Sequence, residues 1–497
     1  MPPALTPPGT LRLDEAAGLD AGAVLAIARG DLAPALGDGL ISWLDERRAG
    51  MLAALAEADS VYGVTTGMGA LSSAELGQAA RPGQSAALLT ARAVGGPPWL
   101  SPAETRAVLA ARLRTFLNGD AAVSAALCGR LADAIALGVL PALPRRSMGV
   151  AGEIVGLAHL GAALTGTGDV LSGAGTRPAG PALSQAGLDP LRLGPKEGIA
   201  LIQGVPMATA LAVLAAANAR TVLGHACTVV AVEFAITGAA RDVLDARLAR
   251  GDRVLAGVAG RLRGLAGAPP ARPRALQPPV SFRAAPQVLA HLARATGALE
   301  GAAERAMAGV TDSPAFLDGR FVGGAGFYGY DLAVHLHALT VALIGVAELG
   351  VARLHRLMDP AVSGMSMQLS ADPGPQAGLP TVHKRAVGVA HELRRQAIPS
   401  VVGPVETSAG QEDAQAFPLE AAQCCRMALD GAIEVLACEL LAVHQARCLG
   451  AALPDGTAPL RADLDLLTAG LPASAQDRPF GRDIEALRER LLGGLVY

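Results

Sequence analysis

The sequence has few aromatic and few charged residues for its length. Only 3% of its 497 residues are Phe, Trp or Tyr and 17% are charged, and the formal net charge is −3. A nearly balanced charge provides no broad basic surface for nucleic acid or for an acidic membrane. We therefore predict neither kind of partner.

The sequence motifs of several enzyme classes are also missing. The chain has six cysteines but no CxxC and no zinc-type spacing. It contains no HExxH, no P-loop and no GxSxG motif. His335 and His337 are two residues apart, so on a helix they would point to different faces and make poor joint metal ligands. We predict no metal site and free thiols in a reducing, cytoplasmic setting.

The N-terminus lacks the basic region and following apolar run of a signal peptide. Two apolar stretches, 199–217 and 332–351, have the length of membrane spans. The first contains Gln203 and the second contains Glu348. We interpret both as buried helices of a large bundle.

Long apolar helical patterns make up most of the remaining chain. They cover about 195–250, 285–309, 331–358, 377–396 and 417–449. Helices that are apolar on more than one face need neighbours on several sides, which favours a mainly α multi-helix bundle. We predict three parts, in order 1–195 with short helices and one or two strands, 196–450 with the long helices, and 451–497 as a helical tail.

Two glycine-punctuated loops stand out. Residues 147–153 read SMGVAGE and lead into an apolar helix at 154–165, in which we expect His159 to be a core residue. Residues 62–69 read YGVTTGMG. Both segments resemble loops of the aromatic amino-acid ammonia-lyases, which include the histidine, phenylalanine and tyrosine lyases and the related aminomutases. The resemblance continues in order through further segments, which are LTAR at 89–92, PKEGIALIQG at 195–204, QPPVSFR at 277–283, GAGFYG at 324–329 and TSAGQED at 407–413.

The tripeptide Val150-Ala151-Gly152 departs from the family at its central residue. In that family an Ala-Ser-Gly tripeptide cyclises into the electrophilic group MIO. Ring closure requires the glycine nitrogen to attack a carbonyl two residues back, and the electrophilic methylene forms when the serine hydroxyl is expelled. Ala151 has no β-leaving group, so we predict that MIO is absent, that no other cofactor is used, and that the usual ammonia elimination is absent or very slow.

The resemblance also assigns the main catalytic positions. Tyr62 matches one catalytic tyrosine, while Val280 replaces the other. A phenol has an unperturbed pKa of about 10, so a base at this position needs help, which Arg283 or loop amides could give. Tyr62 could instead be a structural hydroxyl satisfied by a loop carbonyl. Arg283 matches an arginine that binds the substrate carboxylate, with a structural ion pair as the alternative.

Other candidate residues come from the same segments. Gln203, Gln277 and Gln411 would orient the substrate or bind one another, and Phe327 would form an apolar wall. Tyr328 could line the pocket or transfer protons, and Glu412 could be an acid/base group, a partner for a substrate cation, or structural. Arg92 falls where histidine lyases have Ser-His, which argues against histidine as the substrate.

The resemblance implies a helical bundle of the fumarase/aspartase-like type and a homotetramer in which three subunits build each site. The leading hypothesis is an enzyme without MIO that uses Tyr62 for elimination, addition, isomerisation or cyclisation of a small carboxylate- or carbonyl-bearing substrate, plausibly in a biosynthetic pathway. One alternative is a non-catalytic relative that binds a ligand or an active sibling subunit. Another is a residual ammonia-lyase that works without MIO.

Overall fold

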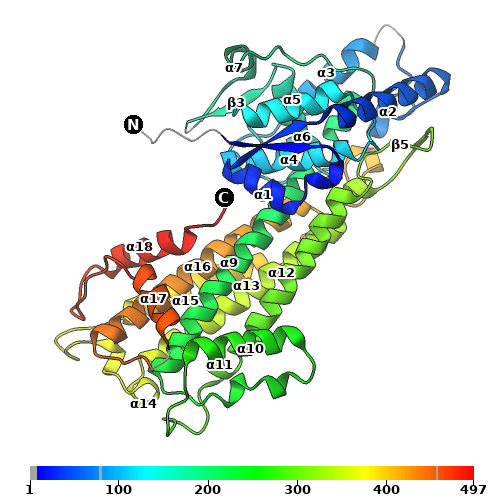
Figure 1. Cartoon of the computed structure of the whole chain (residues 1–497). Helices are drawn as coiled ribbons and strands as arrows, with labels where there is room; N and C mark the ends of the chain where they lie inside the picture. The colour runs from blue at the N-terminus through cyan, green and yellow to red at the C-terminus, as the bar shows by residue number, and fades with distance from the viewer. Residues whose placement is uncertain (1–7, 78–80, 174, 404, 455–456) are drawn as a thin grey trace.

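A computed structural model describes residues 8–77, 81–173, 175–403, 405–454 and 457–497. An N-terminal part with short helices and small strand pairs lies at one end of a bundle built mainly from α9, α12, α13 and α16 (Figure 1). The predicted mainly α fold is confirmed. The boundaries of the three predicted parts stay predictions.

The N-terminal elements, in chain order, are β1 (Gly9–Leu13), α1 (Ala21–Arg29), β2 (Leu32–Leu36), α2 (Asp38–Glu57), α3 (Arg81–Arg92), α4 (Pro102–Leu117), α5 (Ala125–Ala136), α6 (Ile154–Leu164), β3 (Asp169–Ser172), β4 (Gly175–Pro178) and α7 (Ala179–Gln185). The remaining elements are α8 (Glu197–Ile202), α9 (Pro206–Ile236), α10 (Arg253–Ala266), α11 (Val280–Arg283), α12 (Ala285–Ala308), β5 (Ala315–Leu317), β6 (Arg320–Val322), α13 (Tyr330–Leu357), α14 (Pro360–Ser363), α15 (Pro380–Leu393), α16 (Pro418–Cys448), α17 (Ala458–Leu467) and α18 (Phe480–Leu492). Strands β1 and β2 pair in parallel, whereas β3–β4 and β5–β6 are antiparallel hairpins.

Local sequence signals set several helix starts. At α4 the Ser101 hydroxyl accepts a hydrogen bond from the Glu104 N–H at 3.1 Å, and the Glu104 carboxylate accepts one from the Ser101 N–H at 2.7 Å. This reciprocal capping box satisfies two amides that the helix itself leaves free. The long helices α9 and α16 begin at Pro206 and Pro418, which suit a first helical position because no N–H is needed there.

The two membrane-length stretches lie within the bundle. Over 197–236 the most apolar window is 94% buried, and over 326–357 it is 56% buried. The first stretch is therefore a core helix, as predicted. The second, α13, packs on one side and leaves part of its other side open. All six cysteines are free thiols, and Cys425 is fully buried in α16.

One charged cluster lies in the middle of the bundle. Arg353 of α13 donates to Glu233 of α9 through Nε at 2.7 Å, and its Nη2 lies 2.8 Å from a carboxylate oxygen of Glu439 on α16. All three side chains are at most 2% exposed. Burial raises the pKa of Glu233 well above its usual range and also raises that of Glu439. One arginine faces two carboxyl groups, so burial and the charge of the second carboxylate outweigh it, and the pair releases a proton at higher pH than free glutamates do.

Two local expectations were wrong. Residues 38–57 form one helix, α2, rather than short pieces, and its buried residues Leu40, Leu44, Arg48 and Met51 follow a helical stripe. Residues 310–330, for which no strand was predicted between the helical patterns at 285–309 and 331–358, carry the β5–β6 hairpin. The Phe316 N–H of this hairpin donates a hydrogen bond of 2.7 Å to the Asp120 carbonyl in the N-terminal part. The hairpin therefore lies against α2 rather than along the bundle (Figure 1).

Candidate active site

A cavity of about 770 Å³ opens where several loops meet at the N-terminal end of the bundle. Most of the predicted site residues line it, namely Tyr62, Arg92, Val150, Ala151, Gln203, Phe327, Tyr328, Gln411 and Glu412. Segments that are far apart in sequence thus converge on one volume, as the hypothesis of a shared pocket requires. Gly152 follows directly after the two lining residues of its tripeptide.

Tyr62 is held by its own loop. The Gly69 N–H donates a hydrogen bond of 2.9 Å to the Tyr62 phenolic oxygen. The hydroxyl therefore accepts from an amide, whereas the structural alternative proposed a carbonyl partner. An amide donor stabilises negative charge on the oxygen and leaves the phenolic proton free to transfer. Thr65 and Gln84 fix the loop backbone by bonding to Val61 and Gly63, respectively.

The loop that carries Ala151 is tied to the 407–413 loop. The Ala151 N–H donates to Glu412 Oε2 at 3.1 Å, and the Thr407 hydroxyl donates to the same oxygen at 2.9 Å. Gly152 has φ +88°, and a side chain there would approach the Phe327 carbonyl oxygen at 3.2 Å. Glycine is therefore required on both conformational and steric grounds.

Glu153 anchors the other end of this loop. Its carboxylate accepts hydrogen bonds from the N–H groups of Met207 at 2.7 Å and Ala208 at 2.6 Å, in the first turn of α9. These are amides that a helix N-terminus leaves free, and a negative charge is favourable there. Burial nevertheless dominates and raises the pKa of Glu153 to about 8.

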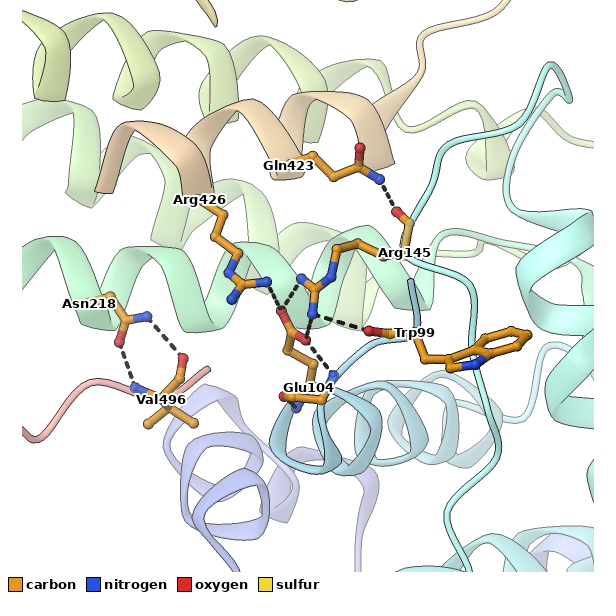
Figure 2. Close-up of polar contacts among 8 residues, drawn as sticks. Trp99, Glu104, Arg145, Asn218, Gln423, Arg426 and Val496 are labelled. Atoms are coloured by element: carbon orange, nitrogen blue, oxygen red, sulfur yellow. Dashed lines mark hydrogen bonds and ion pairs between the residues drawn. The ribbon is translucent and has the colours of Figure 1, made fainter. Parts of the chain in front are cut away.

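Arg145 anchors the chain just before the loop. Its guanidinium binds both carboxylate oxygens of Glu104, at 2.8 and 2.5 Å, and Gln423 of α16 donates to its backbone carbonyl (Figure 2). Arg426 of α16 lies 3.7 Å from the same carboxylate. Burial alone would raise the pKa of Glu104, but the hydrogen bonds and charge of Arg145 outweigh it and the pKa is lowered. The carboxylate stays ionised and links α4, the loop and α16.

The C-terminal tail packs beside this network. The Asn218 side chain accepts from the Val496 N–H and donates to the Val496 carbonyl, both at 3.0 Å (Figure 2). The Arg426 guanidinium lies over the Tyr497 ring at 5.2 Å. The end of the chain is thereby fixed against α9 and α16.

The glycine-rich loop leaves no room for a side chain at position 326. A Cβ on Gly326 would lie 2.0 Å from the Val310 carbonyl oxygen. A residue with a side chain therefore does not fit this backbone at position 326. The Tyr328 ring stacks parallel to the Tyr330 ring, with centroids 6.2 Å apart. Tyr328 itself lines the cavity.

Arg283, Gln277 and Val280 do not reach this cavity within one chain. They lie at or before α11, at the end of the bundle away from α3 and α6 (Figure 1). Arg283 donates to the Gln277 side chain, its Nε has no partner among the described residues, and Val280 is 63% exposed. Tyr62 and Arg283 thus share no cavity in the single chain, and the loop amide of Gly69 rather than Arg283 supports Tyr62.

Comparisons with known proteins agree with this arrangement of loops. The profile of the aromatic amino acid lyase family matches residues 19–465. The chain belongs to this family. Among its relatives, the histidine ammonia-lyase of Geobacillus thermodenitrificans is 32% identical over 467 residues, covering 90% of this chain and 92% of that protein.

Solved structures show the same fold. The tyrosine aminomutase of Streptomyces globisporus is 25% identical, with a TM-score of 0.90 over 98% of this chain and 97% of that one. The ergothioneine-degrading enzyme ergothionase of Treponema denticola is 23% identical, with a TM-score of 0.90 over 97% of this chain and 99% of that one. This aromatic amino acid lyase family member therefore shares the fold of the lyases and aminomutases over nearly its whole described length.

The residues at the tripeptide do not fit the family's MIO group. The Ala151 side chain is a methyl group with no oxygen to expel, and its N–H is bonded to Glu412. No step of a mechanism can be derived through MIO for this family member.

Some lining residues were missed from the sequence. Thr407, Ser408 and Asp413 lie in the quoted 407–413 segment but were not selected, and Ser313 lies outside every quoted segment. An isolated backbone bridge between Thr407 and Glu412 brings Thr407, Ser408 and Asp413 to the cavity. In the sequence, a threonine five residues before a loop glutamate was the pattern that could have predicted this pairing. His159, predicted as a core residue, is only half-buried, and its Nε2 accepts a hydrogen bond from the Gly95 N–H at 3.0 Å.

Proposed function

We propose that this family member is an enzyme that uses the lyase pocket without MIO. The observation that carries the proposal is Ala151, which stands at the position of the cyclising serine and lines a cavity together with Tyr62. The rest of the pocket supports retained chemistry, because Tyr62 receives an amide hydrogen bond and the loop of Ala151 is held by Glu412. We propose a cytoplasmic location for the enzyme.

Tyr62 acts as the acid/base group on a small substrate that has a carbonyl or carboxylate. Since the chain supplies no electrophile at Ala151, the substrate must bring its own activation, such as an acidic carbon next to a carbonyl or a conjugated acceptor. The Gly69 amide stabilises the negative charge of the deprotonated Tyr62, which then takes up the substrate proton and becomes neutral. Elimination, addition, isomerisation and cyclisation each include a proton transfer that such a group can perform.

The working form is a homotetramer. Arg283, Gln277 and Val280 lie at the other end of the bundle from the cavity of their own chain. A second subunit that packs alongside in the opposite direction would bring them to that cavity. Arg283 would then bind a substrate carboxylate through its planar guanidinium.

The first test is ammonia release from histidine, phenylalanine and tyrosine by the purified protein. We expect none above background, and a rate typical of this family would contradict the proposal.

Once a substrate is found, Tyr62→Phe should lower kcat by about 10²- to 10⁴-fold, as loss of a general acid/base does. Tyr330→Phe is the matched control, because Tyr330 is 52% exposed and lies beside the pocket rather than among its lining residues. Equal activity of Tyr62→Phe and the unaltered enzyme would favour a binding or partner subunit whose turnover belongs to a sibling chain.

A further inference from the structure

Arg92 places a positive charge inside the cavity. It is the last residue of α3, it is half-buried, and it lines the same cavity as Tyr62 and Glu412. Its recorded hydrogen bond runs from Nη1 to the Leu88 carbonyl, at a long 3.4 Å, within its own helix. The other N–H groups of its guanidinium have no acceptor among the described residues.

Arg92 has no ion-pair partner in the part of the chain that the structure describes. Other arginines removed from water in this protein are either paired with a carboxylate, as Arg353 is with Glu233, or bonded to several backbone carbonyls, as Arg48 and Arg241 are. Partial burial lowers the pKa of Arg92, whereas electrostatic attraction to Tyr62 and Glu412 raises it by a smaller amount. A desolvated cation without a counter-ion is unfavourable, and an anionic ligand would relieve it.

Glu412 does not serve as that counter-ion. Its Oε2 accepts from the Ala151 N–H and the Thr407 hydroxyl, and these bonds hold the carboxylate toward the 149–152 loop. The cavity thus contains a carboxylate already engaged by the protein and a guanidinium that is available. A planar carboxylate on a ligand matches the guanidinium in charge and geometry.

We propose that Arg92 binds a second carboxylate of the substrate, so that the enzyme acts on a dicarboxylate. This inference rests on the proposed function, in which Arg283 of a neighbouring subunit holds the first carboxylate. The two arginines bind opposite ends of the substrate, and Tyr62 faces the carbon atoms between them. A cavity of about 770 Å³ accommodates a small diacid of this kind.

The test uses the full-length oligomer and two matched probes, cinnamate with one carboxylate and 4-carboxycinnamate with two. Isothermal titration calorimetry should show that the diacid binds at least about tenfold more tightly than the monoacid, as expected for an added charge-assisted pair. Arg92→Met should abolish this preference, because it should weaken binding of the diacid far more than binding of cinnamate. Arg92→Lys should keep part of it, and Arg283→Met should weaken both probes.

Equal affinity of the two probes for the unaltered protein, or no binding of the diacid at millimolar concentration, would overturn the inference without any variant having to fold. So would an Arg92→Met variant that keeps the preference. Because binding is measured without turnover, these outcomes are separate from the ammonia-release test, which addresses the proposed function alone.

Discussion

The backbone N–H of Ala151 donates a hydrogen bond of 3.1 Å to the Glu412 carboxylate, across 261 positions of sequence. This bond joins the loop at which the family forms its electrophile to a second loop of the same cavity. The donor is a peptide N–H of an unreactive alanine, so the contact can shape the pocket but cannot begin the family's dehydration. Glu412 is thus a positioning residue for the 149–152 loop.

Removal of this carboxylate should loosen the loop. In Glu412→Ala the Ala151 N–H loses its acceptor, so amide hydrogen exchange in residues 149–152 should accelerate by about tenfold, the equivalent of one hydrogen bond. Mass spectrometry of peptic fragments measures this change. Glu406→Ala, which alters an exposed glutamate of the same segment, should leave the exchange unchanged. Equal acceleration in both variants would show general loosening of the 405–414 segment instead.

Position 326 should tolerate only glycine. A Cβ at Gly326 would overlap the Val310 carbonyl oxygen at 2.0 Å, so Gly326→Ala should reduce the free energy of unfolding by about 2 kcal/mol through backbone displacement. Gly323→Ala, in the same loop with no atom within 4 Å of the new Cβ, should change it by less than about 0.5 kcal/mol. Urea denaturation compares the two. Equal stability of the two variants would mean that the loop backbone shifts at little cost and that position 326 accepts a side chain.

The buried Glu233–Glu439 pair should make stability fall as pH rises. Because burial raises both pKa values, the folded chain keeps a proton that the unfolded chain releases above pH about 4.3. This proton contributes stability that is fully present at lower pH and is lost as pH rises, with a slope of up to about 1.4 kcal/mol per pH unit.

In Glu439→Gln the part of the slope that comes from the pair should disappear, because the pair no longer holds an extra proton, while the part that comes from Glu153 should remain in both variants. Glu434→Gln is the matched control on the same helix, where Glu434 pairs with Arg385 and is partly exposed. Urea denaturation between pH 5.5 and 8.5 separates the two variants. A slope in Glu439→Gln equal to that of the control would show that the pair titrates normally.

The sequence predicted the long helices well because their signal is local. Apolar periodicity located α12, α13 and α16 within a residue or two, whereas the single pattern predicted over 195–250 contains α8, α9 and the short turns after Ile236. The capping box of Ser101 and Glu104 at the start of α4 is likewise encoded locally. By contrast, α2 was missed because its buried stripe is narrow and its exposed face is rich in charges. The packing of Phe316 against the N-terminal part depends on contacts between distant segments, which no local pattern contains.

The candidate site divides in the same way. Motif order correctly brought Tyr62, Gln203, Phe327 and Glu412 to one cavity. It could not show that Arg283 lies at the other end of the bundle, because a motif carries no information on which subunit completes a site. Nor could it show that Arg92 lacks a counter-ion, since pairing is a property of the folded surroundings.

The most direct test of the account is the mass of the tryptic peptide 147–192, which contains the Val150–Gly152 tripeptide. High-resolution mass spectrometry of the purified protein should give the mass encoded by the sequence, because Ala151 has no hydroxyl to lose. A mass lower by one or two water molecules, with fragment ions that place the loss within the tripeptide, would show a matured ring and contradict the account.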